Sequence, residues 1–515
     1  MSEERNSASL NRAKLYQLVL FPMNNGATNV YYILTLNFIA YYANGVLGLA
    51  LMFATTMVTV MRLFDAATDP IIGALIDRTS TKFGKFRPYM VLGNGIMIVS
   101  SLLLYFGIRI VPEDVMWLRY VCYVLFYALY VIGYTFQTAC TRSGQTCLTN
   151  DPKQRPLFTV FNTVASLIGM GLVQFLAPIL SEHLGGYNSA AFFDVMIPLA
   201  IVVSAVLTLL AVIGIAEKDR PEFFGVGVRQ EKVPFREYVA ILKANKELQR
   251  LMVAGAGCKL AFSIATNMTV LCMLYGAMMG NYGGLYLPMM IIGYVFSVPF
   301  FLLTVRTSQK HGQKASLVRY TTLALIMYVG VLVLLLFWKQ GNPAFNLSLF
   351  PINIYTILFI IFFGVGYGAY YATADMPIPM VADCSDYETW RSGRYIPGIM
   401  GTLFSLVDKL VSSLGSTIVG GVIAMIGIHT LPDGNTPYAD GMHGVVIILF
   451  CIVPMLAWMA TLIAMKGYSL TGARMKEIQI VNGARKEAIS NGMSLEDAME
   501  KYKEVEDVPE KFREA

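Results

Sequence analysis

The residues most able to do chemistry are an arginine and two carboxylates that lie within an apolar segment, residues 46–76. Arg62, Asp65 and Asp69 follow one another at intervals of three and four residues, so a helix would place all three on one face. Ionised side chains at membrane depth are costly and normally face a bundle interior or a wet cavity. Paired carboxylates there suit a small hard cation or a shared proton. A structural ion pair with a nearby base is the alternative.

The composition indicates what kind of protein must position these groups. Hydrophobic residues make up 56% of the 515 residues and charged residues 14%. Soluble domains contain about 25% charged residues, so we expect a membrane protein with several spans. The seven cysteines form no C-x-x-C pair and the four histidines lack metal-ligand spacing, which argues against a disulfide framework or a zinc site. The apolar runs contain no nucleophile–base pair, so we expect no enzyme.

Apolar runs long enough to cross a bilayer, about 20 residues each, recur along the chain. They lie near residues 17–43, 46–76, 89–108, 116–146, 157–181, 190–216, 249–278, 284–305, 316–338, 348–381, 397–427 and 444–466. This pattern predicts an all-α membrane protein with twelve transmembrane helices. The longest internal loop divides it into a six-helix half at 1–216, a central loop at 217–248, a six-helix half at 249–466 and a tail at 467–515.

Basic residues gather in alternate loops. The loops rich in Lys and Arg are 78–87, 153–155, 217–248, 306–319 and 391–394. The opposite loops hold little beyond Arg109, Arg119 and Lys339. The positive-inside rule therefore places the basic loops and both termini in the cytoplasm. The polar N-terminus is not followed by a small-residue cleavage site, so we expect the first apolar run to be a retained span.

The loop after the second span of each half carries the motif R-T-S-x-K-x-G, at residues 78–84 and 306–312. Its recurrence at matching positions indicates an internal duplication. Duplicated six-helix halves are typical of major facilitator transporters, whose binding site lies between the halves near the membrane midplane. We reject a phosphate-binding role for this basic loop because it lacks Walker spacing and follows no strand.

Three features carry a resemblance to a known family. Residues 62–88 read R-x-x-D-A-x-x-D-P-x-x-G-x-x-x-D-R-T-x-x-x-x-G-K-F-R-P. A second motif, A-D-x-x-D-Y, occupies residues 382–387 in the loop after the tenth expected span, and Lys409 follows within the eleventh. Together they make the chain similar to the glycoside–pentoside–hexuronide:cation symporters, the family of melibiose permease.

The resemblance implies a transporter with the major facilitator fold in a bacterial inner membrane. It would move a sugar, glycoside or hexuronide together with Na+ or H+ by alternating access, and it would need no cofactor besides the co-transported ion. Its partners would be the sugar, a monovalent cation and membrane lipid but no nucleic acid, and a monomer would suffice. The alternative is a uniporter or exporter of a small polar solute on the same fold, with structural carboxylates.

The resemblance also implies a cation site. Asp65 and Asp69 take the place of the family's cation-coordinating carboxylates, and they would be metal ligands if the cation is Na+. Lys409 would pair with them when the cation is absent, which would link cation binding to sugar binding. A plain interhelical ion pair is the alternative for Lys409.

The sugar-contacting positions depart from the family pattern. Asn29 stands where the first span often carries an acidic residue, and Cys140 stands at an acidic or amide position of the fourth span. Arg142 replaces a proline, and Asn162 replaces a basic residue of the fifth span. An anionic sugar such as a uronide would suit bidentate Arg142, unless that residue pairs with Asp375 or lines the cytoplasmic mouth. We expect the substrate to contact Asn29, Arg142, Lys259, Asp375 and Lys409.

The remaining charged residues of the two motifs are expected to latch the cytoplasmic ends of the helices in one state. A solvated surface with no such role is the alternative. The residues expected to form the latch are Arg62, Asp77, Arg78, Lys85, Arg87, Asp383, Asp386 and Arg391. In the tail, the spacing of Ser494 and Asp497 is typical of a capping box that opens a short helix.

Overall fold

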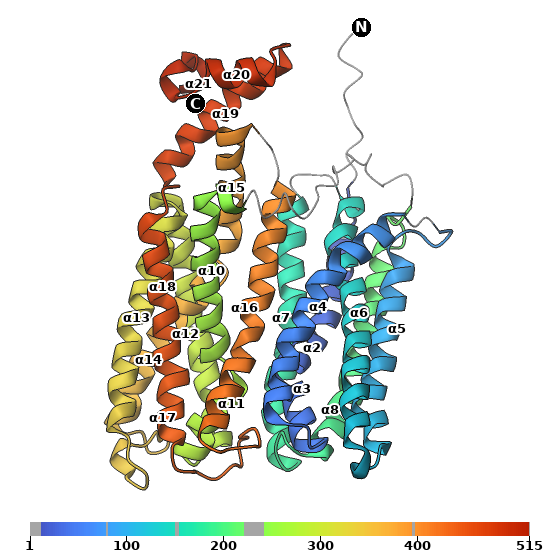
Figure 1. Cartoon of the computed structure of the whole chain (residues 1–515), viewed down its shortest axis with the longest axis vertical. Coiled ribbons are helices and arrows are strands. Elements are labelled where there is room, and N and C mark those ends of the chain that lie inside the picture. Colours follow the sequence, from blue (N-terminus) through green and yellow to red (C-terminus); the bar gives the residue numbers. More distant parts are fainter. Residues whose placement is uncertain (1–11, 79–80, 150–153, 221–241, 394–396, 514–515) are drawn as a thin grey trace. The chain divides into compact units, whose positions relative to one another are not determined.

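The computed structural model describes residues 12–78, 81–149, 154–220, 242–393 and 397–513. Almost all of its regular structure is helical (Figure 1), and within those ranges no strand is formed beyond two isolated bridges. Among these described residues, the helices that are long and apolar enough to cross a membrane build ten spans. Their main helices are α4 (Leu51–Arg78), α5 (Arg87–Leu102), α6 (Met116–Leu148), α7 (Gln154–His183), α8 (Ala190–Ile215), α12 (Tyr282–His311), α13 (Gln313–Phe337), α14 (Ile354–Thr373), α16 (Pro397–Met425) and α18 (Val453–Gly467).

Two of the twelve predicted spans are broken helices. The span expected at 249–278 consists of α10 (Lys246–Ala265) and a second helical segment, 268–278, bent by 44°. Asn267 separates the two parts, and its side chain accepts a hydrogen bond from the Thr269 N–H, as a helix cap does. If this bent pair is one span, the described residues contain eleven.

The span expected at 17–43 is a series of short segments. The α-helical ones are α1 (Leu15–Leu20), α2 (Met23–Ile33) and α3 (Ile39–Tyr41). Pro22 separates α1 from α2, because proline cannot donate to the preceding turn of a helix. Two π-helical stretches, at 34–38 and 42–46, continue the chain. Helical segments thus cover the predicted run, but no single helix does.

The chain packs as two compact units. Unit 1 contains residues 1–230, 271–283 and 416–440, and unit 2 contains residues 231–270, 284–415 and 441–515. Both short insertions into unit 1 come from the predicted C-terminal half. The helix α16 therefore contributes its first part to unit 2 and its last part to unit 1.

In unit 1, α2 packs against α7 and α8, while α6 packs against α4 and α5. The contact between α2 and α7 is made by glycines. A Cβ atom at Gly169 would lie 2.2 Å from the carbonyl oxygen of Gly26, so the two backbones touch, as small residues allow in membrane helices.

Gly169→Ala is expected to destabilise the protein by about 1–3 kcal/mol, since overpacking forces the backbones apart. Gly171→Ala is the matched control on the same helix, because its added Cβ would meet only the Phe175 side chain, at 3.9 Å. The control should melt at or above the wild-type temperature, since alanine favours a helix over glycine. Equal melting temperatures for the two variants in detergent would contradict this contact.

In unit 2, α10 packs against α18 and α13 against α14. The predicted tenth span is divided by a turn at 374–376, which separates α14 from α15 (Pro377–Ser392), and the helical segment continues to Ser392. Pro377 begins α15, a position that proline favours. The A-D-x-x-D-Y motif therefore lies on a helix and not in a loop as predicted.

The tail folds onto α15 as three helices, α19 (Gly472–Ser490), α20 (Leu495–Lys501) and α21 (Glu510–Arg513), which lie beyond the end of α15 in Figure 1. The buried Arg485 side chain donates to the carbonyl oxygens of Tyr502, at 2.8 Å, and Trp390, at 2.7 Å. The Ser494 side chain caps α20 as predicted, accepting a hydrogen bond from the Asp497 N–H.

Candidate functional site

Asp65 is the most deeply buried carboxylate of the predicted cation site, with 1% of its surface exposed. One carboxylate oxygen accepts a hydrogen bond of 2.9 Å from the Thr135 hydroxyl on α6. The other lies 3.3 Å from Nη1 of Arg62, one turn earlier on α4. A buried charge needs such partners, and both are supplied within unit 1.

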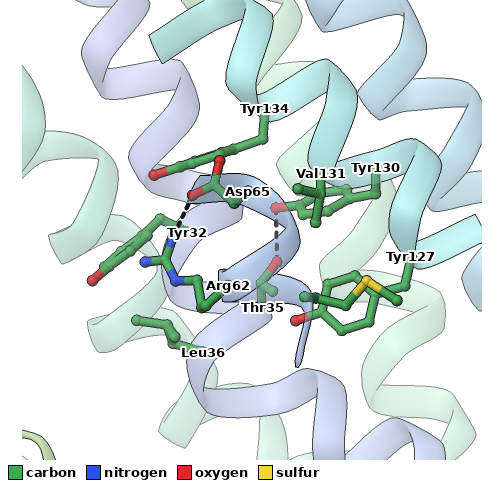
Figure 2. Close-up of a pocket in the computed structure, with 10 residues that line it drawn as sticks. Tyr32, Thr35, Leu36, Arg62, Asp65, Tyr127, Tyr130, Val131 and Tyr134 are labelled. Atoms are coloured by element: carbon green, nitrogen blue, oxygen red, sulfur yellow. Dashed lines mark hydrogen bonds and ion pairs between the residues drawn. The ribbon is translucent and has the colours of Figure 1, made fainter. Parts of the chain in front are cut away.

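Arg62 is held by aromatic rings (Figure 2). Its guanidinium lies 4.6 Å from the ring centroid of Tyr32 and 5.9 Å from that of Tyr134. Aromatic faces attract a cation, more strongly when it is desolvated. Arg62 was predicted to belong to the cytoplasmic latch, and that role stays a prediction; within unit 1 its guanidinium lies beside Asp65.

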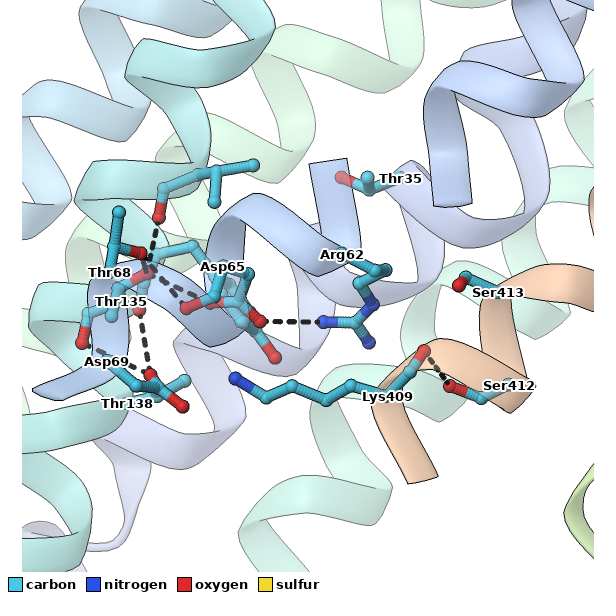
Figure 3. A network of polar contacts seen from close by, with 12 residues as sticks. Thr35, Arg62, Asp65, Thr68, Asp69, Thr135, Thr138, Lys409, Ser412 and Ser413 are labelled. Atoms are coloured by element: carbon cyan, nitrogen blue, oxygen red, sulfur yellow. Dashed lines mark hydrogen bonds and ion pairs between the residues drawn. The ribbon is translucent and has the colours of Figure 1, made fainter. Parts of the chain in front are cut away.

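Asp69 is more open, with a quarter of its side chain exposed. Its carboxylate lies 3.7 Å from Nη1 of Arg142, so Arg142 is paired with Asp69 while Asp375 is paired with Lys259. Thr68 lies between Asp65 and Asp69 in the sequence. Its hydroxyl oxygen lies 3.3 Å from the hydroxyl oxygen of Thr135. Figure 3 shows these threonines and carboxylates gathered along α4 and α6.

This donor set fits a monovalent cation. Hard cations prefer oxygen ligands, and Asp65, Asp69, Thr68 and Thr135 supply carboxylate and hydroxyl oxygens. Among the described residues, no group of three or more His, Cys, Asp or Glu side chains gathers as transition metals require. The adjoining cavity, lined by Arg62, Asp65 and aromatic rings (Figure 2), measures about 20 Å³, which is room for a particle the size of water. Neither Thr68 nor Thr135 was predicted, since threonine is common in apolar helices.

A second group of charges lies in unit 2. Nζ of Lys259 on α10 is 2.6 Å from Asp375 and 3.6 Å from Asp408. Two of the predicted substrate residues thus contact each other, and Asp408 joins them. Lys409 follows on α16, in a different unit from Asp65 and Asp69, so its coupling to them stays a prediction.

The predicted sugar-contacting Asn29 is engaged locally. Its amide donates to the backbone oxygen of Asn25, at 2.8 Å, and to the Asn25 side chain, at 2.9 Å. Asn29 keeps its carbonyl oxygen as a possible acceptor. Its role toward the sugar therefore remains a prediction.

The family model for MFS/sugar transport proteins matches residues 21–472 of the chain. The chain belongs to this family. The putative glycoside/cation symporter YagG of Escherichia coli (strain K12) is 25% identical over 491 residues, which cover 90% of this chain and 93% of YagG. The glucuronide carrier protein homolog of the same strain is 23% identical over 482 residues, which cover 91% of this chain and 96% of that protein.

Among solved structures, the nucleoside transporter NupG matches with a TM-score of 0.56 at 14% identity, covering 88% of this chain and 100% of NupG. This likeness and the family match confirm the predicted all-α major facilitator fold. As a member of the MFS/sugar transport family, the protein is a multi-pass membrane transporter and not an enzyme.

The transporter also contains a buried carboxylate, Asp219, that was not predicted from the sequence. Asp219 is fully buried, and its carboxylate accepts hydrogen bonds from the backbone N–H groups of Lys85, Phe86 and Arg87, at 2.8–3.2 Å. These groups begin α5 and have no helical partners of their own. Gly84 approaches so closely that a Cβ there would lie 2.2 Å from the carboxylate. The backbone N–H groups of two predicted latch residues, Lys85 and Arg87, thus bind an aspartate at the start of the predicted central loop, within unit 1.

The structure describes the positions of the other predicted latch residues, but not all of their side chains. Asp77 and Arg78 end α4, and their side chains lie outside the described residues. Asp383, Asp386 and Arg391 lie on α15.

Arg391 pairs with Glu388, at 2.8 Å, one turn away on α15. The buried Glu388 also accepts a hydrogen bond from Asn245, at 2.9 Å. These contacts join α15 to the start of α10.

Hydrogen bonds attach a segment from the C-terminal half of the sequence, residues 429–432, to the N-terminal part of unit 1. The side chain of Asn44 accepts from the Leu431 N–H, at 2.9 Å, and donates to the His429 carbonyl, at 3.0 Å. Asn188 donates to the Leu431 carbonyl, at 2.8 Å. Tyr41 donates to the Pro432 carbonyl, at 2.7 Å. We call Asn44 and Asn188 the amide clamp.

Proposed function

We propose that this transporter couples the uptake of a sugar or glycoside to the movement of a monovalent cation, held by Asp65 and Asp69 with the hydroxyls of Thr68 and Thr135. The observation that carries the proposal is the pair of carboxylates on one face of α4, one buried and one accessible. Ionisable groups inside a membrane protein mark substrate or ion paths. Two of its relatives are named as a putative glycoside/cation symporter and a glucuronide carrier protein homolog, which supports the same class of activity for this chain.

The sugar contacts proposed in the N-terminal half are Asn29 and Arg142, and those in the C-terminal half are Lys259, Asp375 and Lys409. We place the protein in a bacterial inner membrane, and the basic loops support an orientation with both termini in the cytoplasm. The end of unit 1 that carries the amide clamp then faces outward. The protein would act as a monomer.

Uptake into proteoliposomes tests the proposal. A labelled glycoside should accumulate above its equilibrium level under an inward Na+ or H+ gradient, and an ionophore should abolish the excess. Gradient-independent uptake that stops at equal concentrations would instead identify a uniporter, the alternative in which Asp65 and Asp69 are structural.

The amide clamp is expected to limit the opening of this end of unit 1 during alternating access. Cys272 is fully buried and lies beside Tyr282 and Tyr41, and Tyr41 donates a hydrogen bond to the clamped segment. Replacing Asn44 with alanine removes two hydrogen bonds to that segment, each worth about 0.5–1.5 kcal/mol. Maleimide should then label Cys272 roughly tenfold faster, since 1.4 kcal/mol is a factor of ten in an opening equilibrium.

Labelling is followed by mass spectrometry of the Cys272 peptide in purified protein. Cys451, buried in unit 2, is the internal control and should keep its wild-type rate. An unchanged rate at Cys272 in both Asn44→Ala and Asn188→Ala would contradict a clamping role.

A further inference from the structure

The two carboxylates of the candidate cation site differ in how firmly they are held. Asp65 is bound by Thr135 and by Arg62, and Arg62 is itself packed against aromatic rings. The Arg142 side chain that faces Asp69 is 62% exposed, and the two groups are 3.7 Å apart. Asp65 is therefore firmly held by its partners, while Asp69 can exchange Arg142 for another cation.

The pair between Asp69 and Arg142 is easily broken. Exposed ion pairs add little stability, because water competes with both partners and the long side chain loses freedom in the pair. The guanidinium nevertheless neutralises Asp69, and a cation that binds Asp69 must compete with it. Binding of the cation and release of Arg142 are thus linked.

The charges around Asp65 and Asp69 indicate which partner Arg142 would take after it leaves Asp69. Within unit 1, the positive charges of Arg62 and Arg142 offset the negative charges of Asp65 and Asp69. A bound monovalent cation adds one positive charge, which is costly where the surroundings are apolar. A substrate that carries one carboxylate would offset that added charge. A guanidinium binds a carboxylate through two parallel hydrogen bonds.

The other basic residues expected to contact substrate are less available. Lys259 is 16% exposed and lies between two carboxylates, Asp375 and Asp408. Lys409 is half-buried and next in sequence to Asp408. Arg142 combines high exposure with a single long ion pair, so it is best suited to take a new anion.

We infer that Arg142 exchanges partners during transport, leaving Asp69 for the carboxylate of a hexuronide when the coupling cation takes its place on Asp69. The inference rests on the proposed cation-coupled symport. It makes the substrate an anionic sugar and gives the coupling a physical cause, because each ligand releases the group that the other requires.

Cation affinity without any sugar is the first test. In purified full-length protein, Arg142→Gln should bind Na+ or H+ about 5–10-fold more tightly than the wild type, since Asp69 loses its resident counter-ion. Arg142→Lys should stay within about twofold of the wild type, because it keeps the charge. Arg109→Gln removes another arginine–aspartate pair of unit 1 and should leave cation affinity unchanged. Unchanged or weaker cation binding in Arg142→Gln overturns the inference.

Sugar selectivity is the second test, with methyl glucuronide and methyl glucoside as matched probes. In the wild type, the glucuronide should tighten cation binding at least about tenfold more than the glucoside, and Arg142→Gln should remove that difference. Equal effects of the two sugars, or a difference retained in Arg142→Gln, overturn the inference but leave symport intact. A wild-type protein that responds to neither Na+, Li+ nor pH refutes the symport proposal as well.

Discussion

Asp65→Asn is expected to abolish cation-driven sugar accumulation while leaving sugar exchange across the membrane intact. The amide keeps the size of the side chain and can still accept the Thr135 hydrogen bond, so the fold should survive. It removes one of two anionic ligands, and interactions with charged groups are worth about 1.5–3 kcal/mol each. Cation affinity should therefore fall roughly 10- to 150-fold.

The measurement compares gradient-driven accumulation with counterflow in the same proteoliposomes. Counterflow needs no net cation movement and reports whether the binding site and the conformational cycle remain. Asp194→Asn is the control, because that aspartate is half-exposed and pairs with Arg109. Wild-type accumulation by Asp65→Asn would show that this carboxylate is structural.

Asp219→Ala is expected to cause the largest loss of stability. It leaves the N–H groups of Lys85, Phe86 and Arg87 without an acceptor at the buried start of α5. An unsatisfied buried donor costs about 1–3 kcal/mol, so a total near 3–5 kcal/mol is reasonable once some relaxation is allowed. In thermal unfolding in detergent, the melting temperature should drop clearly.

Asp219→Asn separates charge from hydrogen bonding. It retains one oxygen acceptor but carries no negative charge near Arg87, whose Nε lies 3.5 Å from the carboxylate. Its melting temperature should lie between those of the wild type and Asp219→Ala. If both variants melt with the wild type, the start of α5 does not depend on this carboxylate.

The fold class was predictable because apolar run length is a strong signal. Runs of membrane-spanning length separated by basic loops led to the correct all-α architecture. The breaks in two spans were not anticipated, since Pro22 and Asn267 interrupt runs whose overall hydropathy is continuous. The turn at 374–376 was missed for the same reason.

The candidate site was predictable only in its charged part. Asp65 and Asp69 stand out because carboxylates are rare in apolar runs. Thr135 donates to Asp65 from a helix some 70 residues later, and no sequence spacing reveals such a contact. The partner of Arg142 was equally hidden, because sequence reasoning weighed Asp375 and not Asp69.

Asp219 illustrates the limit most clearly. It lies next to a long basic segment in the sequence and resembles a solvated loop residue. Only the three-dimensional arrangement brings it to the N-terminal N–H groups of α5, where a carboxylate is favoured. The basic loop at 78–87 was predicted to be more than a charged surface, but the aspartate that its backbone N–H groups bind could not be named from the sequence.

The central claim is that Asp65 and Asp69 hold a cation that raises the affinity for sugar. The most direct test is the sugar dissociation constant, measured by calorimetry with and without Na+, Li+ or added protons. We predict that one of these cations tightens sugar binding about 5- to 150-fold in the wild type, and that the Asp65→Asn/Asp69→Asn double variant shows no cation dependence. Equal sugar affinity under all of these conditions, in a wild-type protein that transports the sugar, would contradict the account.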